Sequence, residues 1–259
     1  MDKFIYKKSA GITALAASMT DFTYKRHSHI EYAIGVTLRG IQHYNLDGSL
    51  QLSHRNGVML FNPEQAHDGM AHDKEGLEYV MLYLDPHLLL EVMGKRDRIR
   101  FSEPIVYDNM LKQKIVRLSE AILTEKDDDL CSELLLSLTE GLVKTNLSTD
   151  LKKDNALIKK AKEMLYENLM TIPKLDAISS ELQLSKFQFI RYFKAHTGIS
   201  PYQYFLNCKI ERAKQLIEKN KDIYSAVAEC GFVDLAHLNK HFKNVFGITA
   251  FEYLVNINH

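Results

Sequence analysis

The chain has few cysteines, and their spacing excludes two classes of small domain. Cys131, Cys208 and Cys230 are the three cysteines of the 259-residue sequence, and none of them is part of a Cys-x-x-Cys pair. A disulfide framework or a zinc module needs more cysteines at closer spacing, and free thiols are typical of reducing compartments. The sequence therefore predicts a cytoplasmic protein without structural disulfides.

Long hydrophobic runs are also missing. No apolar segment approaches the roughly eighteen residues that span a bilayer, so we expect no membrane partner. Near the start, three lysines precede the apolar run Ala10–Met19, an order that weakly resembles a secretory signal peptide. The run contains glycine, threonine and serine and a single leucine, which is a poor signal-peptide core. We expect a β-strand there instead.

Two further absences concern chemistry and net charge. The sequence shows no nucleophile–base constellation and no glycine-rich phosphate loop, which argues against an enzyme and against a cofactor. Basic and acidic residues balance at 33 each, yet 17 basic and 22 acidic residues precede Lys152, and 16 basic and 11 acidic residues follow from there on. A basic C-terminal part suits nucleic-acid binding. Many helical domains have an imbalance of this size, so the charge supports such a function without establishing it.

What the chain does contain is enough apolar sequence for two domains and an internal repeat. Hydrophobic residues make up 46% and aromatic residues 10%, as in globular proteins. The segments Ser185–Gly198 (SKFQFIRYFKAHTG) and Asp234–Gly247 (DLAHLNKHFKNVFG) match when the sequence is shifted by 49 positions. The shift aligns Phe193 with Phe242, Lys194 with Lys243, Gly198 with Gly247 and, upstream, Ala177 with Ala226 and Ile178 with Val227.

Each copy of the repeat has the pattern of two helices and a short turn. Ser185 and Gln188 fit a capping box at the start of the longer helix, and Asp234 is the equivalent cap in the second copy. The glycine that ends each copy suits a helix C-cap. Shorter helices are expected before them at Lys174–Leu182 and Ile223–Cys230. This is the helix-turn-helix form, whose second helix can enter the DNA major groove. One such pair is common in helical proteins, and it is the two matching copies that point to DNA.

The repeat resembles the DNA-binding domain of the AraC/XylS (arabinose-regulator) family of bacterial transcription factors over Leu175–Tyr253. In the first copy the residues that carry the resemblance are Ser185, Arg191, Phe193, Lys194, Gly198, Ser200 and Pro201. In the second they are Ala228, Gly231, Phe232, Asp234, Lys240, Phe242, Lys243, Gly247, Thr249 and Tyr253. The sequence departs from the family pattern at Ala250, where proline is usual, and at Lys240, where arginine is commoner.

Residues 1–84 read as β-structure. Strands are predicted at Gly11–Met19, Tyr32–Arg39, Ile41–Leu46, Leu50–Leu52, Val58–Phe61 and Leu77–Leu84. Asp47-Gly48 is a tight-hairpin signal between two of them. Many short strands separated by turns indicate a barrel or a jelly roll. The family resemblance implies a cupin-like barrel that binds a small effector, so the predicted fold class is α+β.

Two histidine-containing clusters lie in this region, at 27–31 and 57–67. On one strand, His27, His29 and Glu31 would share a face, and with His67 they are similar to the metal-ligand pattern of cupins. The family usually keeps the barrel without a metal, so we expect none, with these three histidines as the ligands if one is present. The residues expected to contact an effector are His27, His29, Tyr32, Asn62, His67 and Tyr83. Structural roles for the histidines remain an equal alternative.

The middle of the chain is predicted to be helical. Helices are expected from Pro86, over Met110–Leu123 and over Leu130–Val143, and Leu147–Asn155 reads as a polar linker. The expected domains are thus 1–147 for effector binding and dimerisation, a linker at 148–155, and 156–259 for DNA binding. In the related family the helices near 86–147 also form the dimer interface. An apolar stripe does not distinguish this use from packing on the barrel, which is slightly favoured for any single helix.

The solvent faces of the two repeat helices supply the expected DNA contacts. They are Lys186, Phe187, Gln188, Ile190, Arg191 and Lys194 in the first helix and Ala236, His237, Asn239, Lys240 and Lys243 in the second. Arginine can fork onto guanine and asparagine can pair with adenine, so Arg191 and Asn239 are expected to read bases. Phe187 and Ala236 suit thymine methyl groups, although Phe187 also fits helix packing. Lys194 and Lys243 suit phosphates.

The helix from Pro201 to about Ile217 joins the two copies. At ~1.5 Å per residue it spans about 25 Å, which would bring both helices near successive major grooves ~34 Å apart.

The predicted function is a DNA-binding transcription regulator controlled by a small molecule, acting as a homodimer with RNA polymerase as a further partner. A metal-dependent cupin enzyme fused to a helical domain is the alternative, and a helical adaptor that binds only protein is a third.

Overall fold

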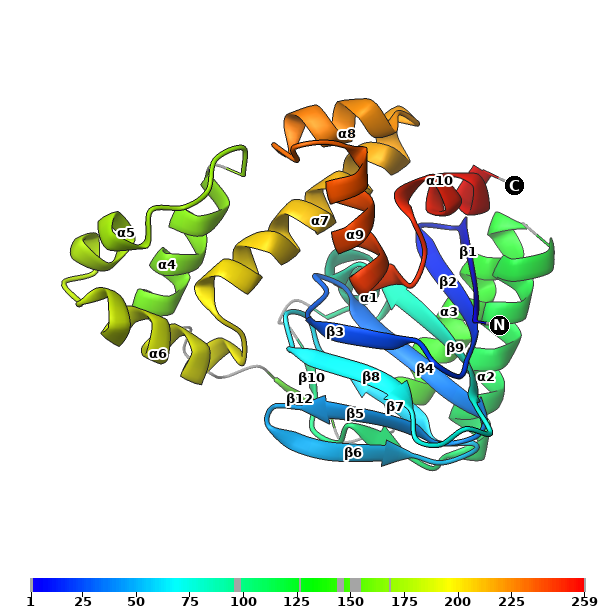
Figure 1. Ribbon diagram of the computed structural model, residues 1–259. Coiled ribbons are helices and arrows are strands. Elements are labelled where there is room, and N and C mark those ends of the chain that lie inside the picture. The colour runs from blue at the N-terminus through cyan, green and yellow to red at the C-terminus, as the bar shows by residue number, and fades with distance from the viewer. Residues whose placement is uncertain are drawn as a thin grey trace. The chain divides into compact units, whose positions relative to one another are not determined.

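The computed structural model describes residues 2–95, 99–125, 127–143, 147–149, 155–167 and 169–258 (Figure 1). The chain divides into two compact units. The first consists of residues 1–23, 29–151 and 255–259, and the second of residues 24–28 and 152–254. The first unit holds most of the strands, and the second is built mainly of helices, as the predicted α+β class requires.

The larger sheet of the first unit has six antiparallel strands in the order β1-β2-β9-β4-β7-β11. Its strands are β1 (Lys3–Ser9), β2 (Ile12–Met19), β9 (Leu77–Leu84), β4 (Tyr32–Arg39), β7 (Val58–Phe61) and β11 (Ile105–Val106). The run Ala10–Met19 is indeed mainly strand, and its residues Ile12–Ser18 pair with β1. Sequence reasoning missed β1 because its lysines made it read as a charged leader.

The smaller sheet has the order β3-β8-β5-β6. Its strands are β3 (Thr23–His27), β8 (His67–Ala71), β5 (Gln42–Leu46) and β6 (Ser49–Ser53). Asp47 and Gly48 join β5 to β6 with φ angles of 50° and 84°, as a two-residue hairpin of the predicted kind requires. His27, His29 and Glu31 do not share one strand: β3 ends at His27, and residues 28–31 connect it to β4.

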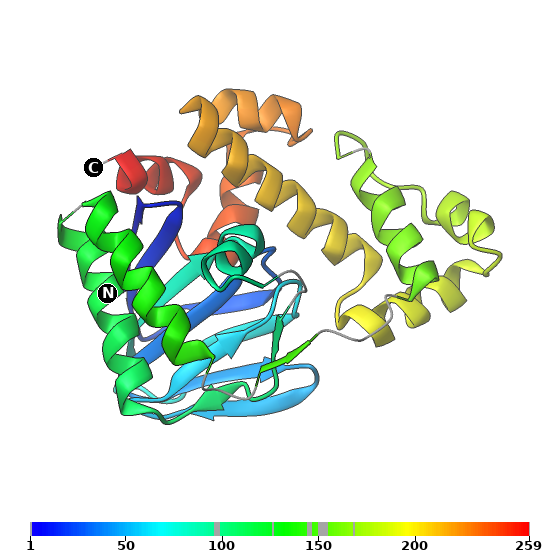
Figure 2. The same cartoon turned by 180° about the vertical axis from the view of Figure 1, so that it is seen from behind.

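Three helices cover one face of the six-stranded sheet. They are α1 (Pro86–Val92), α2 (Asn109–Glu120), which continues as the π-helical turn η1 (Ala121–Glu125), and α3 (Asp128–Leu142). Figure 2 shows α2 and α3 lying side by side across the sheet. Their apolar stripes, with Ile115 and Leu138 at 0% exposure, share one buried cluster with sheet residues such as Ile34 and Leu82. The predicted helices therefore pack on the sheet through the residues that the periodicity selected.

A short two-stranded ribbon changes the predicted linker. Leu147–Thr149 forms β12, which pairs antiparallel with β10 (Ile99–Phe101). The linker prediction of 148–155 is therefore wrong at its start, because these residues belong to a strand of the first unit. The polar composition that suggested a linker is typical of edge strands as well. Residues 150–154 of the predicted linker lie outside the described part of the chain.

The second unit contains two helix-turn-helix pairs joined by one long helix. The first pair is α5 (Leu175–Glu181) and α6 (Lys186–Thr197), and the second is α8 (Ile223–Glu229) and α9 (Leu235–Phe246). The joining helix α7 (Pro201–Asn220) has 20 residues and is therefore about 30 Å long. The unit begins with α4 (Ala156–Glu167), where Asn155 Oδ1 accepts from Leu157 N and caps the helix, and α10 (Ala250–Asn258) follows the second pair.

The two pairs differ by one residue in their turns. The second helices begin 49 positions apart, at Lys186 and Leu235, but the first helices begin 48 positions apart, at Leu175 and Ile223. The upstream alignment of Ile178 with Val227 is therefore corrected: the buried residue that matches Ile178 is Ala226. The hydrogen bonds Leu184 N to Ser179 O and Phe232 N to Val227 O match at the same spacing of 48, which leaves Val233 as the additional residue.

We expect residues 155–259 to fold without the rest of the chain, because this part has its own buried cluster around Phe189, Phe193 and Phe205. Circular dichroism should show helix, and urea should unfold the fragment cooperatively. In this fragment Phe193→Ala should lower the free energy of unfolding by about 3–5 kcal/mol, whereas Phe187→Ala, at a side chain that is 70% exposed, should change it little. An unfolded fragment would contradict the division of the chain at this point.

Candidate nucleic-acid interface and barrel interior

Helix α6 begins and ends as its sequence requires. Ser185 Oγ accepts from Gln188 N at 3.3 Å, and Gln188 Oε1 accepts from Ser185 N at 2.8 Å, so the capping box is complete. Gly198 ends the helix with φ 77° in the left-handed region. Phe189 and Phe193 are both fully buried at 0% exposure. These contacts fix both the length of α6 and the face that it turns to solvent.

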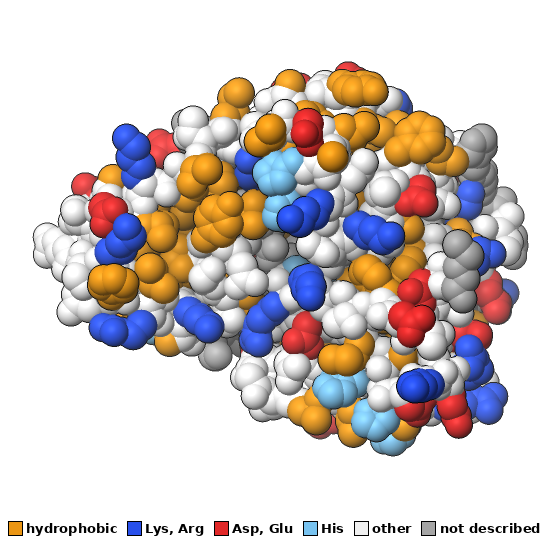
Figure 3. All heavy atoms as spheres, in the orientation of Figure 1, with side chains coloured by type: hydrophobic (Ala, Val, Ile, Leu, Met, Phe, Trp, Pro, Cys, Tyr) orange, Lys and Arg blue, Asp and Glu red, His pale blue; other side chains and the backbone are white. Residues whose placement is uncertain are grey.

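The exposed face of α6 carries a stripe formed by Phe187, Arg191 and Lys194, which we call the α6 stripe. All three side chains are exposed, and basic side chains gather over α6 in the space-filling view (Figure 3). Packing of Phe187 inside the helix pair is excluded by its 70% exposure. Ile190 is half-buried instead.

Two other predicted contacts of α6 have partners inside the unit. Lys186 Nζ lies 2.9 Å from Asp176 Oδ2 of α5, and the side chain of Gln188 is part of the capping box. Both side chains stay exposed, so their first role in the structure is to fix α6 against α5 and at its own start.

Helix α9 repeats this arrangement. Asp234 Oδ1 accepts from His237 N at 2.7 Å at the start, and Gly247 with φ 78° ends the helix. Ala236, Lys240 and Lys243 are exposed and form the α9 stripe. They correspond one for one, at the shift of 49, to the residues of the α6 stripe. Each stripe thus has a side chain suited to bases near the helix start and basic groups one and two turns later.

Asn239 lies away from the α9 stripe. It is half-buried, and its Oδ1 accepts a hydrogen bond from Ala250 N at 3.0 Å, at the start of α10. The expected pairing with adenine is thus corrected, because this oxygen already caps another helix. The contact also accounts for Ala250, since proline would lack the N–H that Asn239 accepts. In the first copy the corresponding residues are Ile190 and Pro201, an apolar pair in place of the hydrogen bond.

His237 is likewise engaged within the second turn. Val233 N donates to its Nδ1 at 3.4 Å, and its Nε2 lies 3.1 Å from Nε2 of His241. With Nδ1 of His237 accepting, its Nε2 carries the proton and donates to His241. Burial lowers the pKa of His241, and the nearby His237, Lys240 and Lys209 lower it further, which favours the neutral form of His241.

Lys209 of α7 contacts two residues of the same turn, Gly231 and Phe232. This lysine is 4% exposed, and its Nζ donates to Gly231 O at 2.9 Å and lies 4.7 Å from the ring centre of Phe232. Burial lowers the pKa of Lys209 and raises that of the Cys230 thiol to about 11, so this thiol is not a nucleophile at neutral pH. Gly231 has φ 62°, and a Cβ there would lie 2.3 Å from Met170 O.

Sequence reasoning missed Val233 as a candidate contact. It is the additional residue of the second turn, it is 85% exposed, and it stands just before the cap of α9. Residues near the start of a recognition helix reach base edges, and a branched apolar side chain suits a thymine methyl group. The signal that could have found it is the length difference between the two turns.

In the first unit, a row of aromatic rings crosses the space between the two sheets. Ring centres are separated by 5.1 Å from Tyr83 to His29, 5.3 Å from His29 to His67, 4.6 Å from His67 to Phe61 and 5.0 Å from Phe61 to Tyr44. His29 and His67 are buried, and Nδ1 of His67 lies 2.8 Å from Gln65 O. When this nitrogen carries the proton, Nε2 is left as an acceptor. Burial raises the pKa of Tyr44, which stays a neutral hydroxyl.

Tyr32 and Asn62 have other partners. Tyr32 Oη donates to Ile99 O at 2.6 Å, Asn62 Nδ2 donates to Phe101 O at 3.1 Å, and Phe101 N donates to Asn62 Oδ1 at 2.8 Å. The expected effector residues therefore fall into two groups. His29, His67 and Tyr83 belong to the ring row, and Tyr32 and Asn62 hold β10.

His27 ends β3, and its Nδ1 lies 2.5 Å from Lys25 O. One ring nitrogen of each of His27, His29 and His67 lies within 4.8 Å of those of the other two, so these three buried imidazoles are close enough together to bind one metal ion. The expectation about a metal stays a prediction.

Comparison with known proteins identifies the family. Residues 9–139 match the family described as the AraC-like ligand binding domain, and residues 178–255 match a helix-turn-helix domain. The chain belongs to the AraC family. The predicted family, fold class and function of a DNA-binding transcription regulator with a ligand-binding domain are thereby confirmed, and they are supported over the metal-dependent enzyme.

Relatives of this AraC-family chain cover nearly its full length. It is 26% identical over 239 residues to the probable transcriptional regulator LumQ of Photobacterium leiognathi, covering 89% of this chain and 91% of LumQ. It is 25% identical over 223 residues to the HTH-type transcriptional regulator YbfI of Bacillus subtilis, covering 83% and 81%.

A solved structure supports the fold. Unsaturated fatty acid bound ToxT of Vibrio cholerae matches with a TM-score of 0.60 at 12% identity, over 99% of this chain and 95% of that one. Among the helices that the structure describes, none is long and apolar enough to cross a membrane.

Proposed function

We propose that this regulator reads its operator through the α6 and α9 stripes, each in one of two successive major grooves. The observation that carries the proposal is the one-for-one match of two exposed stripes on helices whose other faces are buried. The helix α7, about 30 Å long, separates them by a length close to one DNA turn of ~34 Å.

Within each stripe the residues have different tasks. Arg191 and Lys240 stand in the middle of their helices and reach base edges, where the guanidinium of Arg191 can bind O6 and N7 of one guanine. Lys194 and Lys243 stand one turn later and bind phosphates. Phe187, Ala236 and Val233 provide apolar contacts near the helix starts. His237 and Asn239 position the second turn and α10 and do not read bases.

Arg191→Ala should weaken operator binding by about 1–3 kcal/mol and relax the preference at a single base pair, because a bidentate base contact is lost. Lys243→Ala should weaken binding to all sequences alike and lower the slope of affinity against salt concentration by about one. Selection of DNA sequences, followed by titrations at several salt concentrations, measures both effects.

The matched control for these variants is Lys159→Ala, which removes an exposed basic residue of α4 outside both stripes. It should leave base preference unchanged. An Arg191→Ala protein with the base preference of the wild type would falsify the assignment of α6 to a groove.

The ring row of the first unit is the proposed effector site. His29 and His67 bring imidazole nitrogens into an aromatic interior formed from both sheets, which suits a small molecule with an apolar body and one polar or anionic end. Because ToxT has been solved with an unsaturated fatty acid, such acids belong in the first set of compounds to be tested.

His67→Ala should abolish or reduce the increase in melting temperature that an effector causes, because binding to the native state is what raises it. A thermal-shift screen of the wild type, which includes fatty acids, supplies the compound. His43→Ala is the control: His43 pairs with the ring of His72 at 5.9 Å, apart from the ring row. Equal shifts in wild type and His67→Ala would return His67 to a structural role.

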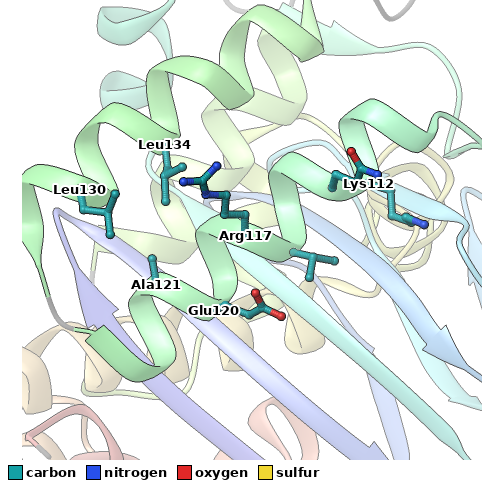
Figure 4. Close-up of a pocket in the computed structure, with 8 residues that line it drawn as sticks. Lys112, Arg117, Glu120, Ala121, Leu130 and Leu134 are labelled. Carbon is teal, nitrogen blue, oxygen red and sulfur yellow. The ribbon is translucent and has the colours of Figure 1, made fainter.

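A second copy of the chain is the proposed partner of α2 and α3. A hollow of about 470 Å³ lies between these helices and is lined by Lys112, Gln113, Val116, Arg117, Glu120, Ala121, Leu130 and Leu134 (Figure 4). Its lining combines basic, acidic and apolar side chains. The basic groups of one copy can therefore face the acidic group of another across a twofold axis.

Arg117→Glu should shift the protein toward monomer in sedimentation velocity, because it places like charges beside Glu120 across the twofold axis. The charge-swapped variant Arg117→Glu with Glu120→Arg restores opposite charges and should restore the dimer. If the single variant remains as dimeric as the wild type, another surface joins the two copies.

The remaining parts of the proposal concern location and domain limits. The regulator acts in the bacterial cytoplasm, where its DNA target lies, and RNA polymerase is a further partner to which no surface is assigned. With β12 included, the effector and dimer domain extends to Thr149, and the DNA-binding domain begins at Ala156.

A further inference from the structure

Two barrel side chains hold the backbone of β10 as a neighbouring strand would. The side-chain amide of Asn62 donates to the backbone carbonyl of Phe101 and accepts from its backbone N–H. Tyr32 donates to the carbonyl of Ile99, two residues earlier. All of these bonds are buried, and the ring of Tyr32 also lies 5.5 Å from that of Phe101 in an edge-to-face arrangement. Two residues of β10, Ile99 and Phe101, are thus fixed by side chains of β4 and of the segment after β7.

The strand held in this way supports β12. Ile99, Arg100 and Phe101 pair with Thr149, Ser148 and Leu147. A two-stranded ribbon of three residues each is too short to be stable in water by itself. The position of β12 therefore depends on what holds β10. After β12 the chain runs through five residues to Asn155, the cap of the first helix of the DNA-binding domain.

Gln65 joins this arrangement to the ring row. Its Oε1 accepts from Asn62 N at 3.1 Å and from Asn62 Nδ2 at 3.3 Å, while its backbone oxygen lies 2.8 Å from Nδ1 of His67. Its Nε2 donates to Asp47 Oδ2 at 2.6 Å, and Arg100 Nη2 lies 3.8 Å from that same oxygen. A displacement of His67 or Gln65 thus reaches Asn62 and the two hydrogen bonds that Asn62 makes with the backbone of Phe101.

We propose that Tyr32 and Asn62 are positioning residues that couple the ring row to the connection between the two domains. A ligand that moves His67 and Gln65, or competes for the Asn62 amide, loosens Phe101 and with it β12. The chain before α4 then starts from a strand, β12, that is held less firmly. The inference deepens the proposed function, because it rests on the ring row being the effector site.

Tyr32→Phe tests the coupling with little change in volume. Hydrogen exchange measured by mass spectrometry on the full-length protein should show exchange at residues 147–149 that is about five- to tenfold faster than in the wild type, the effect of one lost buried hydrogen bond. Tyr253→Phe is the matched control. It also removes the hydroxyl of a fully buried tyrosine, which donates to Glu218 Oε1 at 2.6 Å, but Tyr253 belongs to the second unit and contacts neither β10 nor the ring row through this bond. Equal exchange at 147–149 in the two variants would overturn the proposal.

A cross-strand disulfide provides the reverse test. Arg100 and Ser148 are directly paired, and paired strand residues have Cα separations that a disulfide accepts. Adding Arg100→Cys and Ser148→Cys to Tyr32→Phe should return the exchange at 147–149 to the wild-type rate when oxidised, and reduction should reverse this. The DNA affinity of the oxidised triple variant should return to the wild-type value together with the exchange rate. If the disulfide forms and restores the exchange rate but not the DNA affinity, the coupling is refuted.

Failure of the proposed DNA-binding function can be distinguished from failure of the coupling. A wild-type protein that binds no DNA sequence selectively contradicts the proposed function, whereas the exchange rates at 147–149 still report on the anchors alone. Faster exchange in Tyr32→Phe together with unchanged operator affinity and unchanged ligand response would overturn the coupling but leave DNA binding intact.

Discussion

The burial of one face of each reading helix is the constraint on which the DNA-binding part depends. Phe189 and Phe193 under α6, and Leu238 and Phe242 under α9, are fully buried. Removing such large apolar groups from water is worth roughly 2–3 kcal/mol for each side chain. This fixes the rotation of each helix about its axis, so the stripe opposite the buried face must point outward. The caps at Ser185 and Asp234 then fix where each helix starts.

Local signals let much of this be predicted from the sequence. Both helix pairs and α7 were predicted from the repeat, the caps, the C-terminal glycines and the apolar periodicity. The hairpin between β5 and β6 was predicted from Asp47-Gly48. These features depend on residues within a few positions of one another. The α6 and α9 stripes follow from the same periodicity, which is why their basic residues could be named in advance.

What could not be predicted depends on pairing between distant segments. Strand β12 pairs with β10 across more than forty residues, and nothing in its short polar sequence indicates that partner. Asn239 is an acceptor for Ala250, and Asn62 is a partner for Phe101. An asparagine near a helix start or in a barrel reads equally well as a ligand contact and as a structural clamp. Which of the two roles it has depends on whether a backbone N–H of another element lies within hydrogen-bond distance, and the sequence does not show this.

The continuous helix α7 also sets a limit on the operators that this protein can use. Its 20 residues run without a break between the two helix pairs, so the separation of the two reading helices is a property of the protein and not of a flexible tether. Each added base pair between the two contacted segments would turn them out of phase by about 35°. The spacing of the two segments within an operator should therefore be as characteristic of this regulator as the bases themselves.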